Sequence, residues 1–151
     1  PNYTPTDKLN DNIWFEKLTS IKNNYKQSFL IDLHGMRDDH NYDIIFGFKP
    51  LKNSLNNNDF NIFYNLLFSN FSYFANKYNL KIGYNTLFTG HVSNDIYTIS
   101  QQAIQLGIPA IQIEFSNNFR RKLVKDDLIF NDFFSTLTSF LKCVSFNSDI
   151  L

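Results

Sequence analysis

The chain has 151 residues, and its 14 Lys and Arg residues balance its 14 Asp and Glu residues, so the formal net charge is zero. A dedicated nucleic-acid-binding protein usually carries a basic surplus, so this composition argues against a nucleic-acid partner. Hydrophobic residues make up 43% of the chain and charged residues 19%, which is not the composition of a disordered linker. We expect one compact domain over residues 1–151, with a core rich in Phe.

The sequence contains no apolar run of the roughly 18–20 residues that a membrane helix needs, and no basic-then-apolar leader opens it. We therefore expect no membrane partner and, by default, a cytoplasmic location. The single cysteine, Cys143, cannot form an internal disulfide bond. It falls on the apolar side of an expected helix, so we interpret it as a packing residue and not as a nucleophile.

The hydrophobic pattern alternates between helical and strand-like segments along the chain. Ser93 or Asn94 is the expected cap of the third helix, and Gly107 is its expected stop. Helix–strand alternation predicts a layered α/β domain with a largely parallel sheet. In chain order, the pattern predicts a helix at 12–25, strands at 28–34 and 42–46, a helix at 59–78, a strand at 81–84, a helix at 93–106, a strand at 110–115 and a helix at 126–144.

Polar side chains interrupt two of the apolar strands near their carboxyl ends. Asp32 and His34 are two residues apart and therefore share one face of the first strand, as Gln112 and Glu114 do in the last. In open α/β sheets ligands bind at the carboxyl edge of the strands. A buried carboxylate is costly unless it is paired or coordinated, so these two strands suggest one shared site.

The chemistry that fits these residue types is metal-assisted hydrolysis. His34 would be a metal ligand, and Asp32 or Glu114 would act as a ligand, as an orienting partner of the histidine or as a general base. The alternative is structural, because Asp32 and His34 can simply hydrogen-bond to each other at the end of a strand.

An ordered series of segments resembles the N-formylglutamate amidohydrolase family, whose members are related to the zinc carboxypeptidases. The resemblance implies a three-layer, phosphorylase/hydrolase-like α/β fold with a mixed, mostly parallel sheet. It also implies a zinc-dependent enzyme that hydrolyses an N-acyl amino acid such as N-formylglutamate, or a related amide. The segments are FLIDLHGM (Phe29–Met36), YDIIFG (Tyr42–Gly47), NTLFTGHVSN (Asn85–Asn94) and GIPAIQIEFSNNFR (Gly107–Arg120).

The resemblance implies a role for several residues of this chain. His34 matches the last of three protein ligands to zinc, and Glu114 matches the general acid/base of the carboxypeptidase relatives. Arg120 is the nearest candidate for binding a substrate carboxylate. Gly90 and His91 match a glycine-rich loop at the rim of the pocket.

The family's other two metal ligands come from an H-x-x-E motif upstream, and this chain has none; its histidines are His34, His40 and His91. Three explanations remain open. The chain is the C-terminal portion of a longer domain, or it has lost metal and catalysis, or it has rebuilt the site locally from His34, Asp32 and His40 or His91. The rival functions are a metal-free binding or interaction module and a carboxypeptidase-like or poly-glutamate peptidase.

Overall fold

The computed structural model describes residues 3–146 of the chain. Short 3-10 helices, η1 and η2, cover Thr6–Asp11 and Asp38–His40. None of the helices in the described part has the length and apolar character needed to cross a bilayer. The remaining elements are β1 (Tyr3–Pro5), α1 (Ile13–Asn24), β2 (Leu30–Met36), β3 (Ile44–Gly47), α2 (Lys49–Ser54), α3 (Asn57–Tyr78), β4 (Ile82–Tyr84), β5 (Ile96–Thr98), α4 (Ile99–Gln105), β6 (Ala110–Ser116), α5 (Asn117–Lys125) and α6 (Asp127–Phe146).

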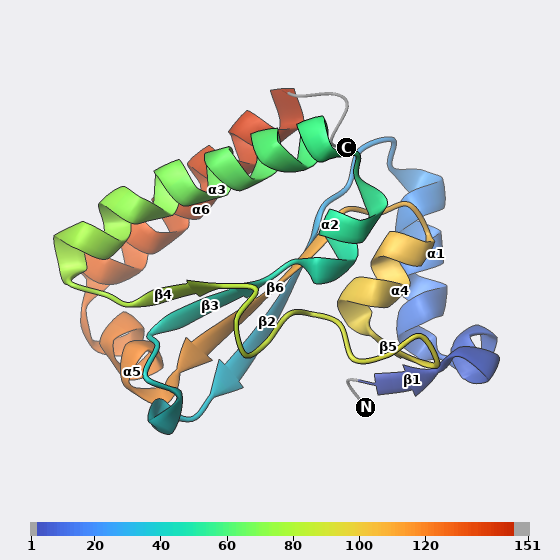
Figure 1. The fold of residues 1–151 in the computed structure, drawn as a ribbon, viewed down its shortest axis with the longest axis horizontal. Coiled ribbons are helices and arrows are strands. Elements are labelled where there is room, and N and C mark those ends of the chain that lie inside the picture. The colour runs from blue at the N-terminus through green and yellow to red at the C-terminus, as the bar shows by residue number, and fades with distance from the viewer. Residues whose placement is uncertain (1–2, 147–151) are drawn as a thin grey trace.

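The main sheet has four strands in the order β2-β6-β3-β4 (Figure 1). The pairs β2–β6 and β3–β4 are parallel, whereas β6 and β3 run antiparallel. A separate antiparallel ribbon joins β1 to β5. The alternating sequence pattern therefore predicted the α/β class correctly, with a sheet that is mixed.

The aromatic residues form the larger hydrophobic core, between one face of the sheet and the long helices α3 and α6. The two helices lie side by side along that face (Figure 1). The ring of Phe71 on α3 lies 4.6 Å from that of Phe46 on β3 and 5.9 Å from that of Phe133 on α6. The sequence prediction of a core rich in Phe is confirmed. Its fully buried Phe residues are Phe46, Phe48, Phe63, Phe71, Phe74, Phe119, Phe133 and Phe140.

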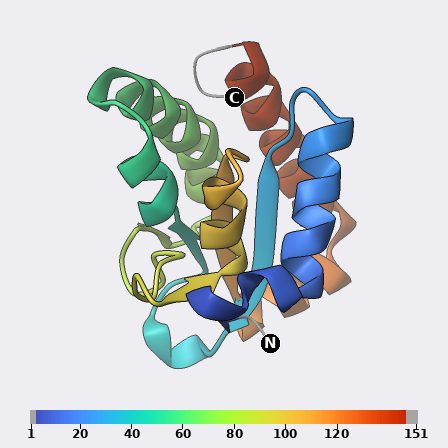
Figure 2. The ribbon, with the colours of Figure 1, turned by 90° about the vertical axis from the view of Figure 1, so that its right-hand side faces the viewer.

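A smaller core lies on the other side of β2 and β6, where α4 packs on the strands and α1 packs on α4 (Figure 2). Its buried members are Leu18 on α1, Ala103 on α4, Ile108, and Ala110 at the start of β6. The central strand β6 is consequently covered on both faces, and all seven of its residues are buried. The edge strand β2 remains partly exposed.

The helix expected at residues 93–106 begins later than predicted. The caps proposed at Ser93 and Asn94 are wrong, because α4 starts at Ile99 and Thr98 is its N-cap. Thr98 and Gln101 form a reciprocal capping box, whereas the Ser93 hydroxyl accepts hydrogen bonds from the backbone of a turn. Gly107, with a φ of +72°, follows the end of α4 as expected.

Candidate functional site

Four polar side chains lie on one face of the two neighbouring strands β2 and β6. The parallel register sets Asp32 opposite Gln112 and His34 opposite Glu114. All four belong to the face that carries Leu30 and Ala110, which pack in the smaller core beneath α1 and α4. The structure thus brings together the two pairs of side chains that the sequence assigns to one candidate site. We call Asp32, His34, Gln112 and Glu114 the polar cluster.

The imidazole of His34 is held between two carboxylates. Its Nε2 lies 2.8 Å from Oδ1 of Asp32, and its Nδ1 lies 3.9 Å from Oε1 of Glu114. The amide of Gln112 donates a hydrogen bond of 2.6 Å to the same oxygen of Glu114. Both nitrogens of the ring therefore face acidic groups, an arrangement that fixes the orientation of the ring.

The surroundings shift the pKa of two members of the cluster upward. The hydrogen bond to Asp32 raises the pKa of His34 above 6.5, against the opposing effect of burial. Burial raises the pKa of Glu114 above 4.5, while the hydrogen bond from Gln112 and the charge of His34 oppose that rise. A raised pKa in a carboxyl group beside an imidazole is a feature of many acid–base sites.

The loop that contains Gly90 lies over the same face of the sheet. A Cβ added to Gly90 would lie 3.6 Å from Cβ of Gln112 and 3.2 Å from the carbonyl oxygen of Gly47. The hydroxyl of Thr98 donates a hydrogen bond of 2.7 Å to the Gly90 carbonyl oxygen and so ties the loop to α4. Gly90 has a φ of +73°, which a glycine adopts without strain. The structure therefore places Gly90, which the resemblance assigns to the rim of a pocket, beside Gln112 of the polar cluster.

The structure does not bring His91 and Arg120 to the polar cluster. His91 lines a separate cavity of about 260 Å³ together with Asn53 and Tyr97. Arg120 is exposed on α5, and its guanidinium lies against Gly35, where an added Cβ would be 2.7 Å away. Successive side chains of a strand point to opposite faces of the sheet, and Gly35 follows His34 directly. Arg120 therefore approaches β2 from the face opposite to the polar cluster.

His40 lies near the cluster without joining it. Its ring packs edge-on against Phe88, with 5.1 Å between centroids, and its charge contributes slightly to lowering the pKa of Glu114. Sequence reasoning missed the role of Gly47 and Phe88, the residues at which β3 and the Gly90 loop touch. A Cβ on Gly47 would lie 2.5 Å from the Phe88 carbonyl oxygen. A glycine at the end of an apolar strand was the available signal for such a close approach.

A zinc ion needs three protein ligands in a catalytic site. Among residues 3–146, no group of three or more His, Cys, Asp or Glu side chains is arranged to hold a metal ion. In addition, both ring nitrogens of His34 already face carboxylates. The described residues therefore do not by themselves fit a catalytic zinc ion.

Comparisons of this chain with models of protein families, with curated proteins and with solved structures find no match. The function is therefore inferred from the chemistry of the polar cluster and from the resemblance of the sequence segments that contain it.

Proposed function

We propose that this chain is an amide hydrolase, or a portion of one, that acts on an N-acyl amino acid such as N-formylglutamate or on a related amide. One observation carries the proposal: His34 is held between Asp32, at 2.8 Å, and the buried carboxylate of Glu114, at 3.9 Å. An imidazole and a carboxylate, both with raised pKa, supply an acid and a base side by side.

In the proposed reaction Glu114 accepts a proton from a water molecule, and the resulting hydroxide attacks the amide carbonyl carbon. The raised pKa makes the Glu114 carboxylate a stronger base than an exposed glutamate. The protonated ring of His34, oriented by Asp32, supplies a positive charge beside Glu114 that stabilises the negative oxygen of the intermediate. When the C–N bond breaks, the proton on Glu114 passes to the leaving amine, and the carboxylate is regenerated.

For the fold we propose the three-layer, phosphorylase/hydrolase-like arrangement that the sequence resemblance implies. Two features support it. The helices α3 and α6 pack on one face of the sheet, and α1 and α4 lie on the other side of β2 and β6.

The sequence resemblance makes His34 one zinc ligand, with Asp32 as a further ligand or as the residue that orients the ring. The described residues supply no complete ligand set for the ion. Bound zinc would supply a water molecule of lowered pKa and a positive charge beside the carbonyl oxygen. None of the proton transfers proposed above depends on it. The rival without catalysis is a metal-free binding module, in which Asp32 and His34 only stabilise the end of β2.

The test is formate release from N-formylglutamate by the purified protein, with Glu114→Gln as the matched variant. The substitution keeps the size of the side chain and an oxygen for Gln112, and we expect it to lower the rate by about 10²–10⁴-fold. Release of amino acids from peptides, without formate, would instead indicate a peptidase.

Metal content separates the remaining alternatives. Stoichiometric zinc that is lost in His34→Ala supports a metal enzyme, and activity without zinc supports the acid–base pair alone. If the folded protein releases neither formate nor amino acids, with or without added zinc, the hydrolase proposal fails in favour of the binding module.

A further inference from the structure

The sheet ends at β2, and the outer edge of this strand is open. Within the part of the chain that the structure describes, β2 pairs with β6 and with no other strand. The N–H group of Leu30 points toward β6, since it donates to the carbonyl oxygen of Pro109 at 2.8 Å. Because backbone groups alternate along a strand, those of Ile31, Leu33 and Gly35 point away from the sheet. An uncovered edge of this kind is a template for another strand.

The side chains of β2 do not protect this edge. Natural edge strands commonly carry lysine, proline or a bulge that discourages pairing. The strand reads LIDLHGM and has none of these residues, and it pairs with β6 in an unbroken register over its whole length. Leu33, at its centre, is 55% exposed. An apolar side chain at the middle of an open edge favours burial against a partner.

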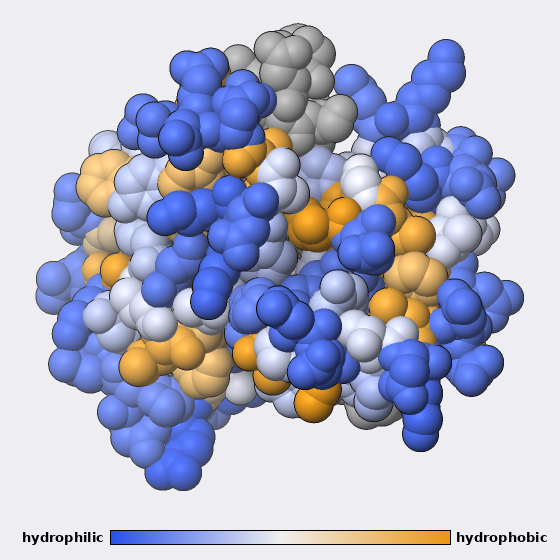
Figure 3. Space-filling model, turned by 45° about the vertical axis from the view of Figure 1, so that its right-hand side comes forward, coloured by the Kyte–Doolittle hydropathy of each residue, from blue (hydrophilic) through white to orange (hydrophobic). Residues whose placement is uncertain are grey.

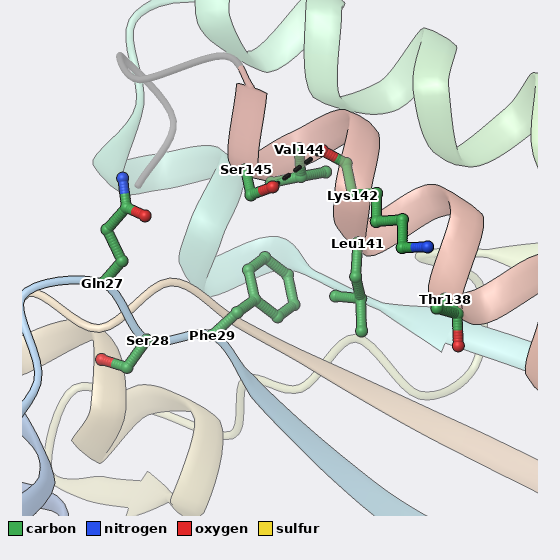
Figure 4. A pocket seen from close by; sticks show the side chains of 8 residues that line it. All are labelled: Gln27, Ser28, Phe29, Thr138, Leu141, Lys142, Val144 and Ser145. Atoms are coloured by element: carbon green, nitrogen blue, oxygen red, sulfur yellow. Dashed lines mark hydrogen bonds between the residues drawn. The ribbon is translucent and has the colours of Figure 1, made fainter.

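The helix α6 adds an apolar stripe beside the same edge. Phe130 and Phe134 are 44% and 40% exposed, and their rings lie 4.6 Å apart. At helical spacing the same face of α6 continues through Thr138, Leu141 and Ser145, of which Leu141 is apolar. These three residues line a cavity of about 380 Å³ whose other wall includes Phe29, next to the start of β2 (Figure 4). The stripe therefore faces the β2 side of the molecule.

The ribbon agrees with this placement. Figure 2 shows β2 with α1 in front of it and α6 behind it, on the same side of the picture. Hydrophobic residues come to the surface in patches between hydrophilic ones on the side of the molecule drawn in Figure 3.

We propose that the open edge of β2 binds a second copy of this chain, by antiparallel pairing of the two β2 strands about a two-fold axis at Leu33. Charge complementarity is the reason for choosing a second copy. The strand carries an acidic residue and an imidazole symmetrically on either side of Leu33. An axis at this residue therefore sets Asp32 of each protomer opposite His34 of the partner subunit.

The direction of the backbone groups supports the same axis. Leu33 points its N–H and C=O outward, so it forms a hydrogen-bonded pair with Leu33 of the partner subunit, with about 5.5 Å between the Cα atoms. Asp32 of one protomer and His34 of the partner subunit then form a non-hydrogen-bonded pair, in which the side chains are closer. The exposed leucines meet at the axis, and the α6 stripes of the two protomers approach each other on one face of the joined sheet.

The pairing changes the surroundings of the polar cluster. Each cluster gains an imidazole and a carboxylate from the partner subunit, on the face that already carries His34 and Glu114. The interface does not depend on the proposed hydrolase activity, because its evidence is the open backbone edge, the exposed apolar side chains and the symmetry of the charges.

The first test is the molar mass in solution, measured by light scattering during size-exclusion chromatography at several concentrations. We expect a dimer for the unaltered chain and a monomer for Leu33→Lys. Leu87→Lys is the matched control, since Leu87 is 57% exposed but lies in the loop between β4 and β5. Circular dichroism establishes that each variant is folded. A monomeric unaltered chain, or a dimer that Leu33→Lys leaves intact, overturns the proposal.

The second test locates the axis by cross-linking in a Cys143→Ser background. The expected separation at Leu33 lies within the range that a disulfide bond spans. Leu33→Cys should therefore form a covalent dimer under mild oxidation, and Leu87→Cys should not. Equal cross-linking of both variants would show random collision and would refute pairing at β2.

The third test uses the charges. Asp32→Lys sets a lysine opposite the partner's His34 and should weaken the dimer. The exchanged variant, with Asp32→His and His34→Asp together, restores opposite pairs across the axis and should recover it. Loss of the dimer in the single variant without recovery in the exchanged variant would contradict the proposed register.

Discussion

His34 and Glu114 are direct partners in the register of β2 and β6, and Oε1 of Glu114 lies 3.9 Å from Nδ1 of His34. A slip of one residue between the strands would send one of these side chains to the opposite face of the sheet. The Gln112–Glu114 hydrogen bond and the Asp32–His34 contact each join residues of one strand. The register of two strands that are distant in sequence therefore creates the acid–base pair.

The contact between Asp32 and His34 predicts a pH-dependent contribution to stability. Because the folded pKa of His34 is raised above 6.5, the charged ring stabilises the fold fully below pH 6.5, and this contribution is lost as pH rises through the folded pKa. We expect His34→Gln to lower the free energy of unfolding by about 1–2 kcal/mol near pH 6 and by less near pH 8.5. Urea titrations across this range measure the difference.

Asp32→Asn is the control for the origin of this effect. It removes the carboxylate that raises the pKa of His34 but keeps the size of the side chain. In this background, His34→Gln should change stability by nearly the same amount at both ends of the pH range. A pH dependence that survives Asp32→Asn would show that the Asp32 hydrogen bond is not its cause.

The aromatic core predicts a large cost for truncating Phe71. This side chain is fully buried among Phe46, Phe133 and Phe140. We expect Phe71→Ala to lower the free energy of unfolding by about 3–5 kcal/mol, because the substitution leaves a cavity in the core. Tyr73→Ala, at an exposed position of the same helix, should change it by about 0.5 kcal/mol or less. Similar losses in both variants would contradict the assignment of the core to this face of α3.

The sequence predicted the long elements better than the short ones, for a physical reason. The stripe of aromatic residues between Phe60 and Tyr78 repeats over many helical turns, so the helix α3 could be predicted to within two residues at its start. The short strand β5 is stabilised by pairing with β1, a partner more than 90 residues away in the sequence. No local pattern encodes such a contact, and residues 93–98 were consequently assigned to a helix.

Prediction of the candidate site from the sequence fails for the same reason, at contacts between segments that are distant along the chain. Spacing along each strand placed Asp32 with His34 and Gln112 with Glu114, and it predicted that the two pairs would meet. It could not show that Arg120 approaches β2 from the other face, because this depends on how α5 folds back on the sheet. Likewise, His91 follows Gly90 directly, but the turn of the loop directs it to a different cavity.

Thr98 links the start of α4 to the loop beside the polar cluster, and its replacement tests that link. Its buried hydroxyl accepts a hydrogen bond from the backbone of Gln101 and donates one to the carbonyl oxygen of Gly90. Thr98→Val keeps the shape but removes both bonds, and we expect it to lower the free energy of unfolding by about 1–3 kcal/mol. Thermal unfolding of Thr138→Val, at an exposed helical position, provides the comparison. Equal stability of the two variants would argue against the Thr98 contacts.

Gly47 and Gly35 lie on β3 and β2, on either side of the central strand β6, and predict opposite outcomes for the same substitution. A Cβ on Gly47 would lie 2.5 Å from the Phe88 carbonyl oxygen and 2.8 Å from the Gly90 nitrogen, both backbone atoms. A Cβ on Gly35 would meet only the end of the flexible Arg120 side chain, which can move aside. Gly47→Ala should therefore displace the loop from the polar cluster and lower both the stability and the proposed hydrolase activity, whereas Gly35→Ala should retain both.

Thermal unfolding and amide hydrogen exchange of residues 86–92 measure this difference. Faster exchange in Gly47→Ala, with unchanged exchange in Gly35→Ala, is the expected result, because the loop depends on its close contact with the backbone of β3. If Gly47→Ala has the same unfolding temperature as the unaltered chain, and the loop amides exchange equally slowly in both proteins, the loop is not held against β3 in the way described. The close approach of Gly47 to Phe88 and Gly90 would then have no part in shaping the site.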